Sequence, residues 1–231
     1  MKLARIAYRR ADAPTNMATD QWMLAMLDDE RGIVFRSYGW QYPAFTFGYT
    51  QRWAEVTAQY PLDGVEWCRR PSGGGIVDHR NDWTYALAIS GQCELGQRSP
   101  LDLYRSVHTA LSDALRSLGV NSEVYEPQEH HDNPAACFER PSPCDVVFQG
   151  TVRKIAGAAL KRTKAGVLLQ GSVDRACIGD VSSEPLEDRF MTGLVKSCSL
   201  ETMIETIDTP EKAPGIPAID QFRSDAWNRR R

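Results

Sequence analysis

The stretch "RRPSGGGIVDH", Arg69 to His79, places three consecutive glycines between two arginines and a histidine. A glycine inside a regular element costs roughly 0.5–1 kcal/mol relative to alanine, so a triplet indicates a backbone that must approach something closely. The stretch lacks the lysine of a phosphate-binding P-loop and opens no helix. A tight hairpin would need only one or two glycines. We therefore expect a ligand loop, whose Cβ-free backbone contacts an elongated ligand and whose amides face a carbonyl or anionic oxygen.

A second stretch, "VRKIAGAALKR", places basic residues on both sides of small apolar ones. A surface strand more often alternates charges with large apolar residues, whereas Ile155 to Leu160 holds four small residues in a row. Such a run indicates a wall on which another group packs. Lys154, beside that wall, would face a carbonyl oxygen or a phosphate. A solvated strand face is the alternative that this segment leaves open.

A third stretch, "AACFERPSPCD", contains Cys137 in a polar loop, 17 positions before Lys154. A cysteine becomes a nucleophile when a nearby cation lowers its pKa from about 8.5 towards 7 or below. A lone cysteine is more often a small buried hydrophobe. These residues alone leave both interpretations open.

The composition excludes several classes of function. A formal net charge of −3 provides no basic field for nucleic acid. No apolar run is long enough to cross a membrane, and the first residues lack the apolar core of a signal peptide. None of the six cysteines forms a CxxC pair, so we expect no metal site. Without a signal peptide, reduced thiols in a cytoplasmic protein are expected.

The elements that must position these residues alternate between helices and short strands. Asn16 is expected to cap a first helix that ends before Gly32, and Ser99, Pro100 and Gly119 bound a central helix. His108 lies on this central helix and is expected to be structural. A third helix is expected near 185–198. Strands are expected at "IVFRSY", "FTFGY", "WTYALAIS", "GVNSEVYEP", "VVF", "VRKIAGAAL" and "GVLLQGSV". These patterns predict one α+β domain over residues 1–205 and a polar tail over 206–231.

Taken together and in order, the motifs resemble those of the lipoate–protein ligase and octanoyltransferase family, the lipoyl branch of the biotin/lipoate ligase catalytic domain. "NMATDQWML" resembles the family's NMAxDxxxL helix, and "RSYGWQYPAFTFGYTQ" resembles RxYxWxxPxxxxGxxQ. "RRPSGGGIVDH" resembles RRxTGGGxVxH, and "RKIAGAALKRTKAGVLLQGSV" resembles the lysine segment RKIxGxAQxRxxxxxLxHGxxL. The resemblance implies a mixed β-sheet flanked by helices.

The resemblance also implies roles for single residues. In the family, the glycine loop lines a tunnel for an eight-carbon acyl chain, the lysine contacts the acyl carbonyl (or the adenylate in ligases), and small residues form the facing wall. Carried over, the lysine is Lys154 and the wall is Gly157 and Ala158. The pocket is lined by Arg70, Gly73, Gly74, Gly75 and His79.

The block "CFERPSPCD" resembles the ACFxxPSxxDL block of the cysteine-dependent octanoyltransferases, which implies that Cys137 carries the acyl group. Ligases of the family more often have an Asn-Asp pair where this chain has Cys144-Asp145, and the larger ones append a second domain. Both differences favour transfer over ligation. Two positions depart from the family pattern: Leu160 replaces a glutamine, and Gln170 replaces a histidine.

The expected reaction moves an octanoyl group from an acyl carrier protein, through Cys137, to a lysine of a lipoyl domain of 2-oxoacid dehydrogenases or of the glycine-cleavage carrier protein. Transfer from a thioester to an amide needs no cofactor. Two alternatives remain open. One is a lipoate–protein ligase that uses ATP and Mg²⁺, with Cys137 dispensable and a separate accessory subunit. The other is a non-catalytic acyl-binding protein.

Two further expectations concern the carriers and the proton. Both carriers are implied to be acidic, and a basic cluster would supply their docking face. That cluster comprises Arg153, Lys161, Arg162 and Lys164. His79 is the candidate base for the incoming lysine, because it lies in the glycine-loop motif.

Overall fold

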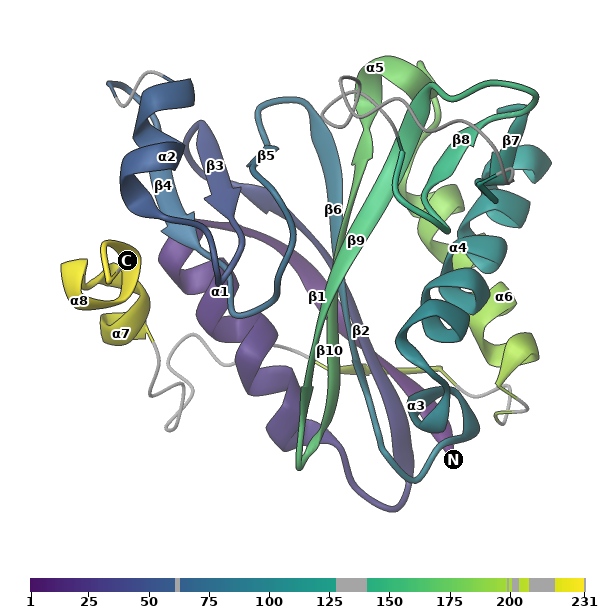
Figure 1. Ribbon diagram of the computed structural model, residues 1–231. Coiled ribbons are helices and arrows are strands. Elements are labelled where there is room, and N and C mark those ends of the chain that lie inside the picture. Colours follow the sequence, from purple (N-terminus) through teal and green to yellow (C-terminus); the bar gives the residue numbers. More distant parts are fainter. Residues whose placement is uncertain (61–62, 128–140, 199, 201–203, 208–218, 231) are drawn as a thin grey trace.

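The computed structural model describes residues 1–60, 63–127, 141–198, 200, 204–207 and 219–230 (Figure 1). Its main feature is a mixed eight-stranded sheet with the order β11-β1-β2-β6-β10-β9-β8-β7. The neighbours of β1 run parallel to it, and the pairs from β2 to β7 are antiparallel. The strands are β1 (Lys2–Ala11), β2 (Arg31–Trp40), β6 (Asp82–Ile89), β7 (Ser122–Val124), β8 (Val146–Phe148), β9 (Lys154–Thr163), β10 (Gly166–Asp174) and β11 (Ile204–Ile207).

Helices cover one face of this sheet, and a smaller sheet with further helices covers the other. On the first face, α4 (Pro100–Ser117) and α6 (Ser183–Ser197) pack on a core that includes Leu87 and Phe190 (Figure 1). On the second face lie α1 (Ala13–Trp22), α2 (Trp53–Gln59) and the small sheet β4-β3-β5. The strands of the small sheet are β3 (Ala44–Phe47), β4 (Glu66–Arg69) and β5 (Val77–Asp78), and short helices α3 (Glu94–Gln97) and α5 (Arg175–Ile178) complete these layers. The predicted α+β class is confirmed.

The central helix α4 forms where local signals predict it. The Ser99 side chain accepts a hydrogen bond from the backbone N–H of Asp102, and Pro100 occupies the first turn, where its missing N–H costs nothing. Gly119 ends the helix with φ +88°, in the left-handed region that glycine adopts without strain. The helix buries a stripe at helical spacing against the sheet, and this stripe contains Leu103, Val107, Leu111 and Leu115.

The first helix differs from its prediction. It begins at Ala13, and Asp12 is the cap, because its carboxylate accepts from the backbone N–H of Thr15 at 2.9 Å. The prediction that Asn16 caps the helix is wrong. Asn16 is buried and donates to the carbonyls of Ala11 and Gly39. After Trp22 the chain continues in a short 3₁₀ helix, Met23–Met26, rather than as α-helix up to Gly32.

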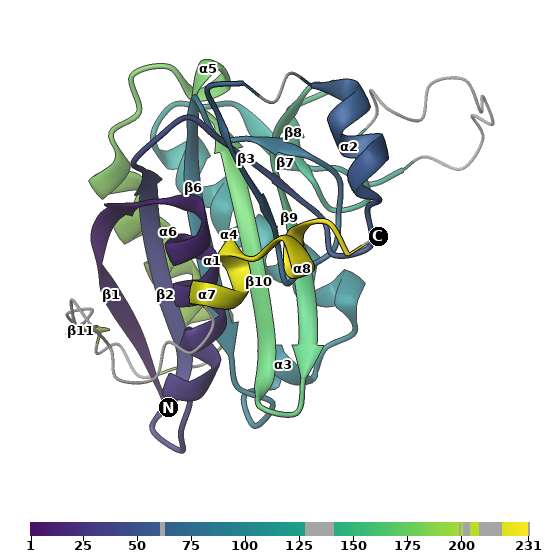
Figure 2. The ribbon, with the colours of Figure 1, turned by 90° about the vertical axis from the view of Figure 1, so that its left-hand side faces the viewer.

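The residues expected to form a polar tail contain packed elements. β11 pairs with β1, and the helices α7 (Ile219–Arg223) and α8 (Asp225–Asn228) pack against α1 and β4 (Figure 2). Phe222 is fully buried, and Asn228 accepts a hydrogen bond from the backbone of Arg69. The expectation of a tail therefore fails for these residues. Their burial depends on partners more than 150 residues away, which the polar local composition does not reveal.

Among the described residues, no helix is both long and apolar enough to pass through a membrane.

Candidate active site

A cavity of about 1240 Å³ lies along β9 and β10, between the glycine loop and α4. The backbone of the loop and the small residues of β9 form its walls. Its lining includes the following predicted site residues: Arg70, Gly73, Gly74, Gly75, His79, Lys154, Gly157 and Ala158. The two separate sequence stretches that were expected to bind a ligand thus meet at one cavity.

The glycine loop is built for close approach at one residue and for open space at two others. Gly74 has φ +84°, and a Cβ on it would lie 3.4 Å from the Cβ of Ala159. A Cβ on Gly48 would lie only 1.9 Å from the carbonyl oxygen of Gly74. Side chains on Gly73 or Gly75 would meet nothing within 4 Å. The backbone at these two positions is therefore open to a ligand rather than packed on protein.

Arg70 braces this loop from inside. Its guanidinium is buried and donates to the carbonyl oxygens of Gly73 at 2.9 Å and Gly75 at 2.7 Å. It also donates to the hydroxyl of Thr46 at 2.7 Å. Burial lowers the pKa of Arg70 to about 10, so the side chain stays charged at neutral pH. The loop is thus held in shape by a buried cation that lines the cavity.

A chain of hydrogen bonds continues from Thr46 through His79 to Asp82. Thr46 Oγ1 lies 2.7 Å from His79 Nε2, and His79 Nδ1 lies 2.7 Å from Asp82 Oδ2. The His79 ring also stacks on Trp40, with ring centroids 4.1 Å apart. Both ring nitrogens are engaged, so His79 can accept a proton at Nε2 only when Thr46 turns its hydroxyl away. This geometry favours a positioning role for His79 over the predicted role of base.

Lys154 forms an ion pair with Asp145, with 2.7 Å between Nζ and Oδ2. The carboxylate side chain is 6% exposed and the lysine side chain 50% exposed. An ammonium has three N–H donors, so one is used by Asp145 and others remain available to a ligand. A Cβ on Gly157 would lie 2.5 Å from Lys154 Nζ, which explains the need for glycine there. The charged end of Lys154 therefore occupies the space beside the wall.

The bend that carries Asp145 is held by His108, whose cavity position the sequence did not predict. Cys144 has φ +67°, a left-handed conformation that asparagine adopts more easily than cysteine. His108 Nδ1 donates to the carbonyl oxygen of Cys144. This bond agrees with the expected structural histidine. His108 also lines the cavity, and its Nε2 has no hydrogen-bond partner among the described residues.

A buried polar network lies beneath the cavity, and sequence reasoning missed it. Asp20 is fully buried and accepts from Gln170 Nε2 at 2.7 Å and from the Tyr38 hydroxyl at 2.9 Å. Arg36 Nε lies 3.3 Å from the other carboxylate oxygen. Burial raises the pKa of Asp20 despite these contacts. Gln170, where the family pattern has a histidine, also accepts from Ser72 at 2.5 Å and so connects the glycine loop to this network.

The structure does not bring the four predicted docking residues together. β9 spans ten residues, so Arg153 and Lys164 lie at opposite ends of a segment roughly 30 Å long. Arg162 donates to the backbone carbonyls of Gly96 and Arg98, which commits its guanidinium to the fold. Lys161 lies over the ring of Tyr49. These residues form no single patch.

The predictions of a nucleophilic cysteine and of no metal site can be compared with the structure only over the described residues. Cys137, the predicted nucleophile, lies outside the residues that the structure describes. The described cysteines are free thiols. Over the described ranges, no group of three or more His, Cys, Asp or Glu side chains is arranged to hold a metal ion.

A mixed sheet, a glycine loop and a lysine at the cavity wall thus come together at one site. The chain belongs to the family of the lipoyl protein ligase A/B catalytic domain, whose model matches residues 12–183.

Curated relatives carry the name octanoyltransferase LipM. One from Kyrpidia tusciae is 32% identical over 175 residues, covering 71% of this chain and 62% of the relative. One from Carboxydothermus hydrogenoformans is 32% identical over 161 residues, covering 68% of this chain and 59% of the relative. The matched region thus spans less than two thirds of these relatives' own length.

Solved structures share the fold. A putative lipoate protein ligase from T. acidophilum has a TM-score of 0.76 at 19% identity, covering 100% of both chains. A lipoate-protein ligase A bound with ATP has a TM-score of 0.74 at 17% identity, covering 99% of this chain and 98% of the other. The predicted biotin/lipoate ligase type of fold is confirmed.

Proposed function

We propose that this protein moves an octanoyl group from an acyl carrier protein to a lysine of a lipoyl-accepting domain, through a thioester on Cys137. The observation that carries the proposal is the Lys154–Asp145 ion pair at a cavity with a Cβ-free wall. The names of the curated relatives support the reaction class. An eight-carbon chain needs an apolar lane, and a reacting carbonyl needs a fixed cation at its end.

The acyl chain would lie between the glycine loop and β9. There the glycine loop approaches the small side chain of Ala159 at Gly74, and its backbone is open at Gly73 and Gly75. Large side chains on either wall would fill this lane. The carbonyl end of the acyl chain would lie at Lys154, because that residue provides the ammonium beside Gly157. The buried carboxylate of Asp145 holds this ammonium in place.

The transfer takes two balanced steps. The Cys137 thiolate attacks the carbon of the donor thioester, the bond from that carbon to the carrier sulfur breaks, and the carrier leaves as a thiol after taking one proton. A neutral lysine amine then attacks the octanoyl-cysteine, the C–N bond forms, and the C–S bond breaks. The amine nitrogen loses a proton, and Cys137 returns as a thiol. An amide replaces a thioester, so the sequence runs downhill without ATP.

Lys154 would stabilise the oxyanion that forms in both steps. Its N–H groups that Asp145 does not use can donate to the developing negative charge. Removing one such donor typically lowers the rate by about 10²–10³. The ammonium would also favour the thiolate form of a cysteine that comes near it.

One observation favours a second candidate, a lipoate–protein ligase. The cavity of about 1240 Å³ is larger than an octanoyl chain requires, and its lining includes Arg80 and Asn81 beyond the acyl lane. Such room would suit an acyl-adenylate. In a transferase the same room would take the arm of the donor carrier. The two candidates differ in whether ATP, Mg²⁺ and Cys137 are needed.

The test is intact-protein mass spectrometry after mixing the protein with octanoyl-acyl carrier protein without ATP. A single octanoyl adduct is expected that hydroxylamine removes, that Cys137→Ala abolishes and that Cys177→Ala, at a half-exposed thiol, retains. No adduct, together with transfer from free octanoate only when ATP and Mg²⁺ are added, would establish the ligase. Octanoate binding without turnover in either assay would identify a non-catalytic acyl-binding protein.

A further inference from the structure

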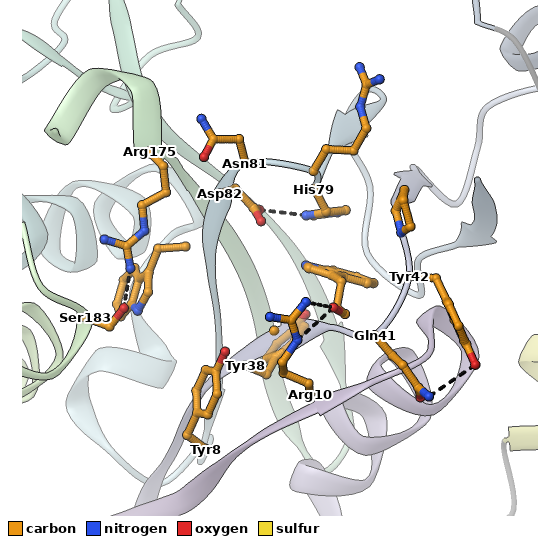
Figure 3. A pocket seen from close by; sticks show the side chains of 15 residues that line it. Tyr8, Arg10, Tyr38, Gln41, Tyr42, His79, Asn81, Asp82, Arg175 and Ser183 are labelled. Atoms are coloured by element: carbon orange, nitrogen blue, oxygen red, sulfur yellow. Dashed lines mark hydrogen bonds and ion pairs between the residues drawn. The ribbon is translucent and has the colours of Figure 1, made fainter. Parts of the chain in front are cut away.

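A second cavity of about 400 Å³, shown in Figure 3, shares the His79–Asp82 pair with the first cavity as part of its lining. The two cavities share several wall residues. The other walls of the second cavity come from the ends of β1 and β2, the turn before β6, and Arg175. The shared residues are Tyr38, His79, Arg80, Asn81 and Asp82. Such an arrangement would let the acyl chain and the acceptor lysine reach this wall from different directions.

The wall between the cavities contains a carboxylate, Asp82, of which one oxygen lacks a hydrogen-bond partner among the described residues. The Asp82 side chain is 3% exposed. Its Oδ2 accepts from His79 Nδ1, from the Thr84 hydroxyl at 2.8 Å and from the Ser172 hydroxyl at 2.7 Å. Its Oδ1 has no hydrogen-bond partner within the described part of the chain. A buried carboxylate oxygen without a donor is costly, and an arriving cation with N–H groups would satisfy it.

The aromatic rings that line the second cavity suit a flexible alkyl arm that ends in a cation. Tyr38, Trp40 and Trp83 line the inner part of the second cavity, and Tyr42 and Tyr8 lie at its exposed part (Figure 3). Aromatic faces pack on methylene groups and attract an ammonium through the ring quadrupole. A lysine side chain has this combination of a methylene stem and a charged tip.

Guanidinium groups also line the second cavity, and they indicate the surroundings of that lysine. Arg80 is paired with Asp78. Arg10 donates to the carbonyl of Trp40, and Arg175 donates to the carbonyl of Val181 and to Ser183. Burial lowers the pKa of Arg175, and the charge of Asp82 opposes this in part.

Among the described residues, the hydrogen bonds of Arg10 and Arg175 go to backbone carbonyls and a serine hydroxyl rather than to carboxylates, so these two residues favour an incoming segment whose other side chains are acidic.

The strand register connects this site to the reacting end of the first cavity. Ser172, which donates to Asp82, is the direct β-ladder partner of Gly157. Lys154 Nζ lies in the space beside Gly157. Paired residues point to the same face of a sheet, so the carboxylate and the ammonium lie on one face, with Ser172 and Gly157 between them. An amine at Asp82 would therefore approach a carbonyl held by Lys154.

We propose that the second cavity admits the acceptor lysine, presented by an acidic segment of the acceptor domain, and that Asp82 Oδ1 receives its ammonium before the proton is lost. This site rests on the proposed function for the identity of the acceptor. It adds the route of entry and the group that selects an amine.

The test is a double-mutant cycle on binding, which needs no turnover. The dissociation constant of an apo lipoyl domain, and of its acceptor Lys→Met variant, is measured by calorimetry against the native enzyme and Asp82→Asn. The Lys→Met change is expected to weaken binding to the native enzyme about tenfold, within the range of close interfacial charge pairs. Its effect on Asp82→Asn is expected to stay below twofold, because the partner charge is gone.

Because Asp82 also anchors His79, Thr84 and Ser172, a second variant tests the cavity without touching that network. Tyr42 is 51% exposed, and Tyr42→Ala is expected to raise the KM for the acceptor domain about fivefold through the lost packing of its ring on the incoming segment, with acylation by octanoyl-acyl carrier protein unchanged. Tyr60→Ala is the control, because Tyr60 is also exposed, at 39%, and lines neither cavity.

The outcomes separate this inference from the proposed function. A lipoyl domain that binds with strictly additive effects of Asp82→Asn and Lys→Met, and with Tyr42→Ala equal to Tyr60→Ala, would overturn the acceptor site alone. A lipoyl domain that binds no form of the enzyme and receives no acyl group would overturn the acceptor part of the proposed function, and this site with it.

Discussion

The ammonium of Lys154 lies 2.7 Å from the carboxylate of Asp145, in space that any side chain on residue 157 would enter. This ammonium is thus positioned by two features, a buried anion that attracts it and a missing Cβ that leaves room for it. Neither feature belongs to the lysine itself. Both can be changed while Lys154 is kept.

The first prediction is that Gly157→Ala separates the lysine from its site without unfolding the protein. The new Cβ would lie 2.5 Å from Nζ and 2.7 Å from Asp145 Oδ1, so the flexible lysine end must move. We expect kcat to fall at least tenfold while Tm changes by only a few degrees. Gly75→Ala, where a Cβ meets nothing within 4 Å, is the control for stability. Unchanged kcat in Gly157→Ala would refute the assigned position of the ammonium.

The second prediction concerns the charges of the ion pair. Lys154→Met is expected to lower kcat about 10²–10³-fold, because it removes the oxyanion donor. Asp145→Asn keeps Lys154 but weakens its anchor, so a smaller loss is expected. Single-turnover kinetics of both acylation and transfer would measure the effects. Equal losses in Lys154→Met and in Lys161→Met, at another lysine of β9, would contradict a specific role.

The third prediction concerns His108 and the pH dependence of stability. Burial lowers the pKa of His108 below its ordinary 6.5, with a weaker lowering by Lys154 and opposing contributions from the Cys144 carbonyl and Asp145. Below pH 6.5 the unfolded chain therefore binds a proton that the folded ring resists. The free energy of unfolding then falls as pH falls below 6.5. His108→Asn, which keeps a donor for Cys144, is expected to lose this part of the acid sensitivity.

The control for this measurement is His108→Ala, which leaves the Cys144 carbonyl without its donor and should cost about 1–3 kcal/mol at pH 7.5. Denaturant unfolding between pH 7.5 and 5 would measure both variants. If His108→Asn declines with acid as steeply as the native protein, the acid response belongs to other groups.

The fourth prediction concerns the helices α7 and α8. Arg69 is fully buried and donates to the carbonyls of Trp227 at 3.1 Å and Asn228 at 2.8 Å. Phe222→Ala is expected to cost about 3–5 kcal/mol, as for other buried aromatic residues. Asp220→Ala, on the exposed side of α7, should change stability by less than 0.5 kcal/mol. Similar urea midpoints for both variants would show that these helices are not part of the cooperative unit.

Elements with strong local signals could be predicted from the sequence, and the contacts between distant segments could not. α4 has a cap, a first-turn proline and a terminal glycine within its own sequence, so its bounds were predictable. The glycine triplet indicated a ligand loop because three consecutive glycines destabilise a regular element, and close approach of a ligand to the backbone accounts for them. By contrast, Asp12 rather than Asn16 caps α1, since both residue types suit the position and packing selects between them.

Within the site, residue types were more predictable than their partners. Lys154 and the glycines could be named from motifs, but the anchor Asp145 depends on the left-handed turn at Cys144, which has no glycine to mark it. The predicted docking cluster does not form one patch. Its basic residues are close in sequence, but an extended strand spreads them along its length. The sequence did not mark Asp82 as a site residue, because its proposed role depends on one carboxylate oxygen that lacks a hydrogen-bond donor within the described part of the folded protein.

β1 lies between β2 and β11, so the first strand of the chain finds one of its neighbours about 200 positions later. Arg69 likewise donates hydrogen bonds to the carbonyls of residues 227 and 228, which are synthesised much later. During synthesis, a ribosome therefore releases most of the cavity walls before the chain can close the far edge of its sheet. We expect the nascent protein to remain a substrate for chaperones until residue 228 emerges, and to become protease-resistant abruptly at that point.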